Sequence, residues 1–160
     1  MQRALKYPRI AAERTHDIAL IRDIVGSMWS DIAEDGQLFE DFTPECVEEC
    51  WLNINDMAVW CFHAENSTTL DIHVHILKAY RGQSVEIGYA MWEWFMNHCP
   101  GEYEKINCTI PVIHPNVKAY AELMGMVQEG VNRKSYCKNG EIIDQWMMGI
   151  TRTEVEEFMQ

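Results

Sequence analysis

Residues 70–94 read LDIHVHILKAYRGQSVEIGYAMWEW, and no other part of the chain constrains the architecture as strongly. The first eight residues alternate apolar and polar side chains, which predicts a β-strand with one buried face. From Ser84 to His98 the apolar spacing becomes helical, and Arg81-Gly82 lies in the short connection. The backbone N–H groups at the start of such a helix can seat a phosphate or pyrophosphate. The alternative is an ordinary surface loop.

The same pattern analysis predicts helices and strands over most of the remaining chain. Helices are expected at residues 15–29, 43–51 and 115–124, and Pro44 stands near the first position of the second one. Strands are expected at residues 57–64, 105–113, 126–137 and 141–151, with a tight turn at Asn139-Gly140. No linker or repeat is visible, so residues 1–160 are expected to form one α/β domain around a mixed sheet.

Composition and charge exclude several classes of function. The 160 residues contain 13 Lys and Arg against 25 Asp and Glu, a formal net charge of −12. This deficit argues against a general nucleic-acid coat and against a polybasic membrane-surface protein. No signal peptide or membrane span is visible, and the six scattered cysteines indicate free thiols in a reducing cytoplasm. The expected location is therefore cytoplasmic, without nucleic-acid or membrane partners.

Two groups of residues resemble the GNAT superfamily of acetyl-CoA-dependent N-acetyltransferases, over roughly residues 15–154. Residues 71–84 are similar to the family's strand and its Arg/Gln-x-x-Gly-x-Gly/Ala pyrophosphate loop. The second group resembles the branch that acetylates protein N-termini, including ribosomal proteins, and more loosely versions encoded by tailed phages. It comprises Gly125-Met126, Glu129-Gly130, Arg133, Asn139-Gly140, Asp144 and Arg152-x-Glu154. The resemblance implies a mixed, mostly antiparallel central sheet flanked by helices.

The resemblance also implies an activity, a co-substrate and a binding site. The activity is direct transfer of an acetyl group from acetyl-CoA to a primary amine in a ternary complex, without a metal. The acceptor would be a protein N-terminus, a lysine or a small amine, and the acidic surface suits a cationic amine or basic peptide. An exposed edge of the hairpin could also support a homodimer. If the protein is phage-encoded, its expected location is the host cytoplasm. The residues expected to bind the coenzyme are Ile76, Leu77, Lys78, Arg81, Gly82, Gln83, Ser84, Val85 and Asn116, with the backbone of Ile76 and Leu77 serving the developing oxyanion.

Four side chains are candidates for the proton transfers of this reaction. Asp71, His73 and His75 share one strand face, and any of them can be the base that takes the proton of the amine. Tyr120, one residue from the position where the family often has a tyrosine, is the candidate acid for the leaving thiolate. The alternatives are an exposed strand residue for Asp71, polar sheet residues for the histidines and a core aromatic for Tyr120. A three-histidine metal site with His63 is a further alternative.

Three departures from the family pattern support a second hypothesis. Ser84 replaces the first motif glycine, Glu86 stands where glycine or alanine is usual, and Ala121 occupies the position of the tyrosine. A carboxylate near a helix start opposes a bound phosphate if it points inward. The alternative function is therefore a GNAT-fold protein without catalysis, serving as a binding or virion-associated component.

Overall fold

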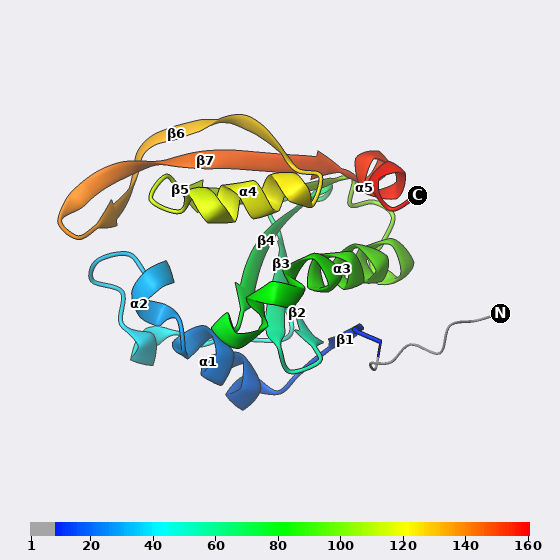
Figure 1. Ribbon diagram of the computed structural model, residues 1–160, viewed down its shortest axis with the longest axis horizontal. Helices are drawn as coiled ribbons and strands as arrows, with labels where there is room; N and C mark the ends of the chain where they lie inside the picture. Colours follow the sequence, from blue (N-terminus) through cyan, green and yellow to red (C-terminus); the bar gives the residue numbers. More distant parts are fainter. Residues whose placement is uncertain (1–8) are drawn as a thin grey trace.

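A computed structural model describes residues 9–160, which build one seven-stranded sheet in the order β1-β2-β3-β4-β5-β7-β6 (Figure 1). Neighbouring strands are antiparallel except β4 and β5, which run parallel. The strands are β1 (Ala12–Arg14), β2 (Glu49–Ile54), β3 (Ala58–Ala64), β4 (Thr69–Ile76), β5 (Lys105–Pro111), β6 (Val127–Lys138) and β7 (Glu141–Thr151). The mixed, mostly antiparallel sheet expected from the sequence is thus confirmed.

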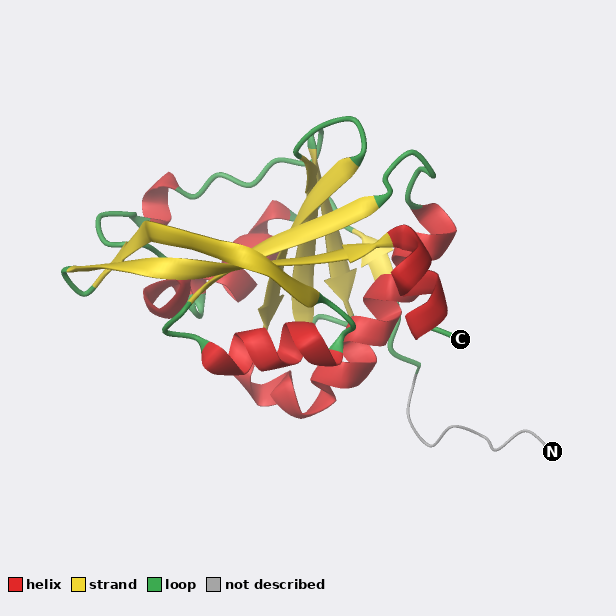
Figure 2. Ribbon diagram, turned by 90° about the horizontal axis from the view of Figure 1, so that it is seen from above, coloured by secondary structure: helices red, strands yellow, loops and turns green. Residues whose placement is uncertain are grey.

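Helices cover both faces of this sheet (Figure 2). They are α1 (Ile18–Gly26), α2 (Trp29–Ile32), α3 (Ser84–His98), α4 (Pro115–Leu123) and α5 (Arg152–Phe158), with 3-10 turns η1 (Phe39–Asp41) and η2 (Lys78–Gln83). On one face, α3, α4 and α5 contribute to the larger apolar core, which includes Trp60 and Phe95. On the other face, α1 packs against Trp51, Val59 and Cys61. Among residues 9–160 no helix is long and apolar enough to cross a membrane.

The parallel pair β4 and β5 separates soon after it forms. Pairing covers only Thr69–Asp71 with Lys105–Asn107, although β4 continues to Ile76 and β5 to Pro111. The two strands then lead to different helices, since α3 follows β4 through η2 and α4 follows β5. The divergence leaves a wedge in the middle of the sheet, and Asp71 lies at its apex.

The long β6–β7 hairpin reaches back to the segment after α2 (Figure 1). Its turn has the left-handed backbone expected of Asn139-Gly140, with φ of 53° and 78°. The Asp35 carboxylate accepts the backbone N–H groups of Asn139 at 3.0 Å and Gly140 at 2.8 Å. The Lys138 ammonium donates to the carbonyl of Ser30 at 2.6 Å. Two segments more than 100 residues apart in the sequence are thereby joined.

The helix expected at residues 43–51 is wrong. The Glu45 carboxylate accepts the backbone N–H groups of Val47, Glu48 and Glu49, which closes a compact turn in place of a helix. Strand β2 begins at Glu49 and pairs with β1 on one side and β3 on the other. Cys50 and Trp51 therefore belong to the sheet, because pairing with two strands outweighs the local helical spacing.

Other predicted boundaries differ less. The helix expected at residues 15–29 is confirmed as α1 with the shorter α2 behind it, and Asp17 caps α1 by accepting the N–H of Leu20 at 3.0 Å. Helix α3 has the expected bounds; its Trp92 and Phe95 are buried, whereas His98 at its end is exposed. The reason is that α3 also packs against the C-terminal segment, where the Arg152 guanidinium lies 4.4 Å from the Phe95 ring.

Candidate active site

A cavity of about 620 Å³ occupies the wedge between β4 and β5. Its walls come from both strands, from the α1–α2 region, from α4 and from the β6–β7 hairpin, so segments from the whole chain meet there. Among the described residues that line it, the charged side chains are the carboxylates Glu49 and Asp71, without a lysine or arginine. The cavity is therefore suited to a cationic or neutral group better than to an anion.

The backbone of β4 presents donors to this wedge. In an antiparallel pair, alternate residues direct their N–H groups to the partner strand. Leu77 donates its N–H to Met57 at 3.0 Å, which fixes the alternation, so the N–H groups of Val74 and Ile76 point away from β3. They face the side from which β5 has separated.

The two predicted oxyanion donors, the N–H groups of Ile76 and Leu77, point to opposite sides of β4. Ile76 lies where the resemblance implies, whereas the N–H of Leu77 is already used within the sheet. Val74 was missed, although the period of two along any strand indicates that consecutive amides cannot face the same side. The donors that the structure offers are thus Val74 and Ile76.

The predicted pyrophosphate loop is wound into η2 and continues directly into α3. Lys78, Arg81, Gly82 and Gln83 are exposed, and Ser84 and Val85 are half-buried. The N–H of Ser84 donates to the carbonyl of Arg81, so in this conformation that amide is engaged. Glu86 is exposed in the first turn of α3, where its charge favours the helix dipole. Asn116 is exposed in the first turn of α4.

Asp71 and His73 lie together at the apex, and His63 from β3 joins them. His63 is paired in register with Asp71, and its Nε2 lies 3.3 Å from Asp71 Oδ2 and 3.2 Å from His73 Nε2. Burial raises the pKa of Asp71 to about 6, with a further rise from Glu65 and a partial offset from His63. A carboxylate with this pKa can accept a proton near neutral pH. His63 was not among the predicted catalytic residues, because the register of β3 against β4 is not readable from the sequence.

His75 has different surroundings from the other two histidines. Its ring stacks on Trp51 with centroids 6.3 Å apart, and burial lowers its pKa to about 3, with a smaller contribution from His73. The ring is therefore neutral at neutral pH and a weak base. The alternative of a three-histidine metal site does not match this geometry, since the donor atoms that converge belong to His63, Asp71 and His73.

Tyr120 joins α4 to the start of α3. Its hydroxyl donates to the carbonyl of Ser84 at 2.7 Å, and burial raises its pKa. Gly88 makes this close approach possible, because a Cβ there would lie 2.9 Å from the Tyr120 oxygen. The hydroxyl proton is thus directed at the α3 backbone in this conformation.

Two buried nitrogen atoms at the cavity have no hydrogen-bond partner among residues 9–160. They are Nε1 of Trp60, a residue that is 1% exposed, and Nδ1 of His75. An unsatisfied buried polar atom costs about 1–3 kcal/mol. A ligand with polar atoms at this position would remove that cost.

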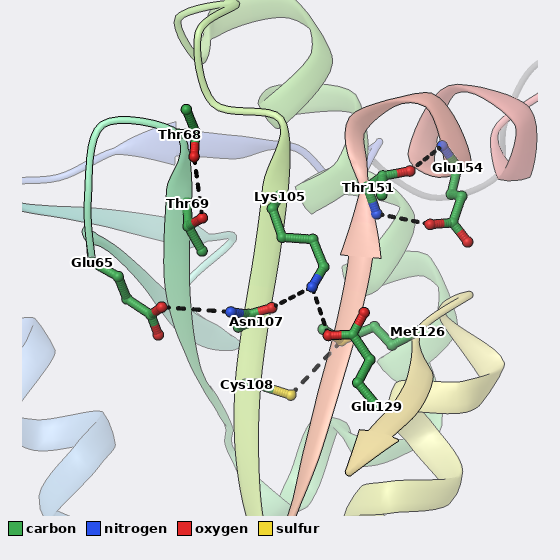
Figure 3. Close-up of polar contacts among 10 residues, drawn as sticks. All are labelled: Glu65, Thr68, Thr69, Lys105, Asn107, Cys108, Met126, Glu129, Thr151 and Glu154. Carbon is green, nitrogen blue, oxygen red and sulfur yellow. Dashed lines mark hydrogen bonds and ion pairs between the residues drawn. The ribbon is translucent and has the colours of Figure 1, made fainter.

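Several residues of the C-terminal resemblance have structural roles here (Figure 3). Lys105 Nζ donates to Asn107 Oδ1 at 2.9 Å and contacts Glu129 Oε1 at 2.6 Å, which ties β5 to the bulged strand β6. Glu129 fits because Gly149 opposite has no side chain. Glu154 forms a reciprocal capping box with Thr151 at the start of α5.

Among the comparisons with known proteins, only the one with solved structures finds matches. No protein-family model and no curated protein sequence matches the chain. The spermidine N-acetyltransferase of Vibrio cholerae, in its complex with CoA and spermine, aligns with a TM-score of 0.72 at 14% identity, over 92% of this chain and 98% of that one. A chimera of the Vibrio cholerae enzyme SpeG with hSSAT aligns with a TM-score of 0.72 at 15% identity, over 93% and 99%.

The likeness extends over nearly the whole of both chains. The finer resemblance to the ribosomal-protein branch and to phage-encoded versions stays a prediction. The expectation of the fold is confirmed: the chain has the GNAT fold of the spermidine N-acetyltransferases.

Proposed function

We propose that this protein transfers an acetyl group from acetyl-CoA to a primary amine. The observation that carries the proposal is the wedge itself, a cavity at the separation of β4 from β5. Val74 lines this cavity, and the N–H groups of Val74 and Ile76 face the side from which β5 has separated. The amide groups of a pantetheine arm can pair with such an open strand edge as a further strand would. The unpartnered N–H of Trp60 offers one more donor at the same cavity.

The residues around the cavity fit the requirements of amine acetylation. Acetyl-CoA supplies the acetyl group as a thioester. An ammonium acceptor first loses one proton to a base, and the neutral amine then forms the C–N bond as the C–S bond breaks. The nitrogen loses a second proton, which ends on the leaving thiolate as CoA thiol. Asp71 is the candidate base, because its raised pKa suits proton transfer near neutral pH and it lies at the apex of the wedge. Arg81, exposed at the turn before α3, is the candidate phosphate contact.

The acceptor that fits best is a small cationic amine. The carboxylates of Glu49 and Asp71 line the cavity together with the aromatic rings of Trp29, Phe42 and Trp51, and such a wall attracts an ammonium group. The relatives in structure are named for spermidine, and one was solved with spermine, which supports a polyamine. A protein N-terminus is the competing acceptor.

Calorimetry and a thiol-release assay test the proposal. Acetyl-CoA is titrated into the protein by isothermal titration calorimetry, and release of CoA is followed with spermidine, spermine or a peptide with a free N-terminus. We expect binding of one acetyl-CoA and faster release with a polyamine, while Asp71→Asn binds the coenzyme without turning it over. The absence of binding at millimolar acetyl-CoA would refute the proposal.

A binding protein without catalysis is the second candidate. The observation that favours it is the amide of Ser84 at the start of α3, which is already engaged by the carbonyl of Arg81. This alternative predicts either no coenzyme binding or binding without thiol release for every amine. Turnover that is lost in Asp71→Asn would exclude it.

A further inference from the structure

Three side-chain atoms with lone pairs converge beside the wedge, on the face of the sheet against which α1 packs. Nε2 of His63 lies 3.2 Å from Nε2 of His73 and 3.3 Å from Oδ2 of Asp71, and the third side of the triangle, from His73 to Asp71, is 3.8 Å. The two imidazole rings lie nearly parallel, 13° apart, with centroids at 5.3 Å. The β3–β4 register holds this arrangement, since His63 is opposite Asp71 and His73 lies two residues further along β4.

Protons alone do not satisfy this triangle. His63 Nε2 carries at most one hydrogen, so it can donate to His73 or to Asp71 and not to both. One of the two short contacts of His63 Nε2, to His73 or to Asp71, is therefore always left without a linear hydrogen bond. A cation at the centre would satisfy all three atoms at once.

The size of the triangle fits a transition-metal ion. A point equidistant from the three atoms lies about 2.0 Å from each of them, which is within the usual range of zinc bonds to histidine nitrogen and carboxylate oxygen, about 2.0–2.2 Å. Two imidazole nitrogens and one carboxylate oxygen favour zinc, cobalt or nickel over magnesium or calcium. We propose that His63, Asp71 and His73 form a binding site for one divalent transition-metal ion, Zn²⁺ above all.

The surroundings of the triangle support this assignment. Glu49 is paired in register with His63, and Glu65 lies two residues after His63 in the chain, so two more carboxylates add negative potential. The His73 side chain is 52% exposed, which leaves the ion accessible to water or to another ligand. Three protein ligands with an open position are the arrangement of metal sites that exchange ligands.

This inference does not require acetyl transfer. It does have a consequence for it, because Asp71 is also the candidate base, and an ion bound to its carboxylate competes with the proton it would accept. Binding is therefore measured without acetyl-CoA or an amine, so that its failure is distinguishable from a failure of the proposed function.

Metal binding is tested on untagged, metal-free full-length protein. Zn²⁺ is titrated by isothermal titration calorimetry, and Co²⁺ by visible absorption, which is intense for four-coordinate cobalt and shows a separate charge-transfer band when a thiolate binds. We expect one Zn²⁺ per chain, and intense cobalt bands without thiolate charge transfer. The His63→Gln variant should bind Zn²⁺ at least about tenfold more weakly.

Two variants serve as controls. His98→Gln removes an exposed histidine outside the triangle, and Cys61→Ser removes the thiol paired in register with His73; both should bind Zn²⁺ as the wild type does. Unchanged affinity in His63→Gln, a thiolate band, or no binding by the wild type would each overturn the proposal. If circular dichroism shows that His63→Gln is unfolded, His73→Gln replaces it, and the wild-type cobalt spectrum decides the ligand type independently.

Discussion

Replacing Gly88 by alanine measures how tightly α4 is packed against α3. A Cβ at this position would lie 2.0 Å from Met124 Sδ, whereas ordinary contacts between heavy atoms are about 3.5–4.0 Å. Met124 is only 2% exposed and lines the cavity, so its side chain must either shift into that cavity or push α4 away from α3. Overpacking of this kind costs about 1–3 kcal/mol, while replacing glycine inside a helix regains about 0.5–1 kcal/mol. We expect a net loss of about 1 kcal/mol.

Thermal unfolding followed by circular dichroism is the appropriate assay. A loss of about 1 kcal/mol lowers Tm by about 2–4 °C in a protein of this size. The matched control is Gly82→Ala in η2, where a Cβ would meet nothing within 4 Å and no loss of stability is expected. A Tm of Gly88→Ala at or above that of the wild type would refute the view that glycine is needed for the contact between α3 and α4.

Three further predictions concern the cavity. Asp71→Asn should lower kcat/KM about 10²–10⁴-fold. In the wild type, log kcat/KM should fall more steeply with decreasing pH below about pH 6, because both Asp71 and the amine must be deprotonated, and the variant should lack this steeper part. An unchanged pH profile would mean that Asp71 is not the base. Trp60→Phe should weaken acetyl-CoA binding about fivefold, or about 1 kcal/mol, in calorimetry, because the N–H donor at the cavity is removed; equal affinity would contradict this. The pKa of His75 falls from 6.5 to about 3 on folding, so the folded state binds fewer protons than the unfolded state between these pH values. The free energy of unfolding should therefore decrease as the pH falls from 6.5 to about 3. Urea titrations over this range should show a smaller decrease for His75→Gln.

The elements around the wedge are predictable from sequence because their patterns are strong and local. Alternation over eight residues specifies β4, the helical spacing after Ser84 specifies α3, and Asn139-Gly140 specifies the hairpin turn. Each of these signals depends on near neighbours in the chain. Tertiary packing confirms them without changing the type of element.

Strand β2 and the composition of the apex were not predictable in the same way. The spacing of Cys46 and Cys50 is compatible with a helix, and only pairing with β1 and β3 makes the second half of that segment a strand. The meeting of His63 with Asp71 likewise depends on the register between two strands, which a shift of one residue would abolish. Such information is distributed between segments and is not present in either one alone.

The contact of Asp35 and Ser30 with the hairpin tip has a consequence for the order of events during synthesis. Strands β1 to β4 are consecutive neighbours in the sheet and can pair as soon as each has been made. The wall between the α2 segment and the hairpin, in contrast, is completed only after residue 140 has left the ribosome. A nascent chain that already contains β4 and α3 therefore lacks the hairpin wall of the cavity, which is completed only when the chain is almost finished.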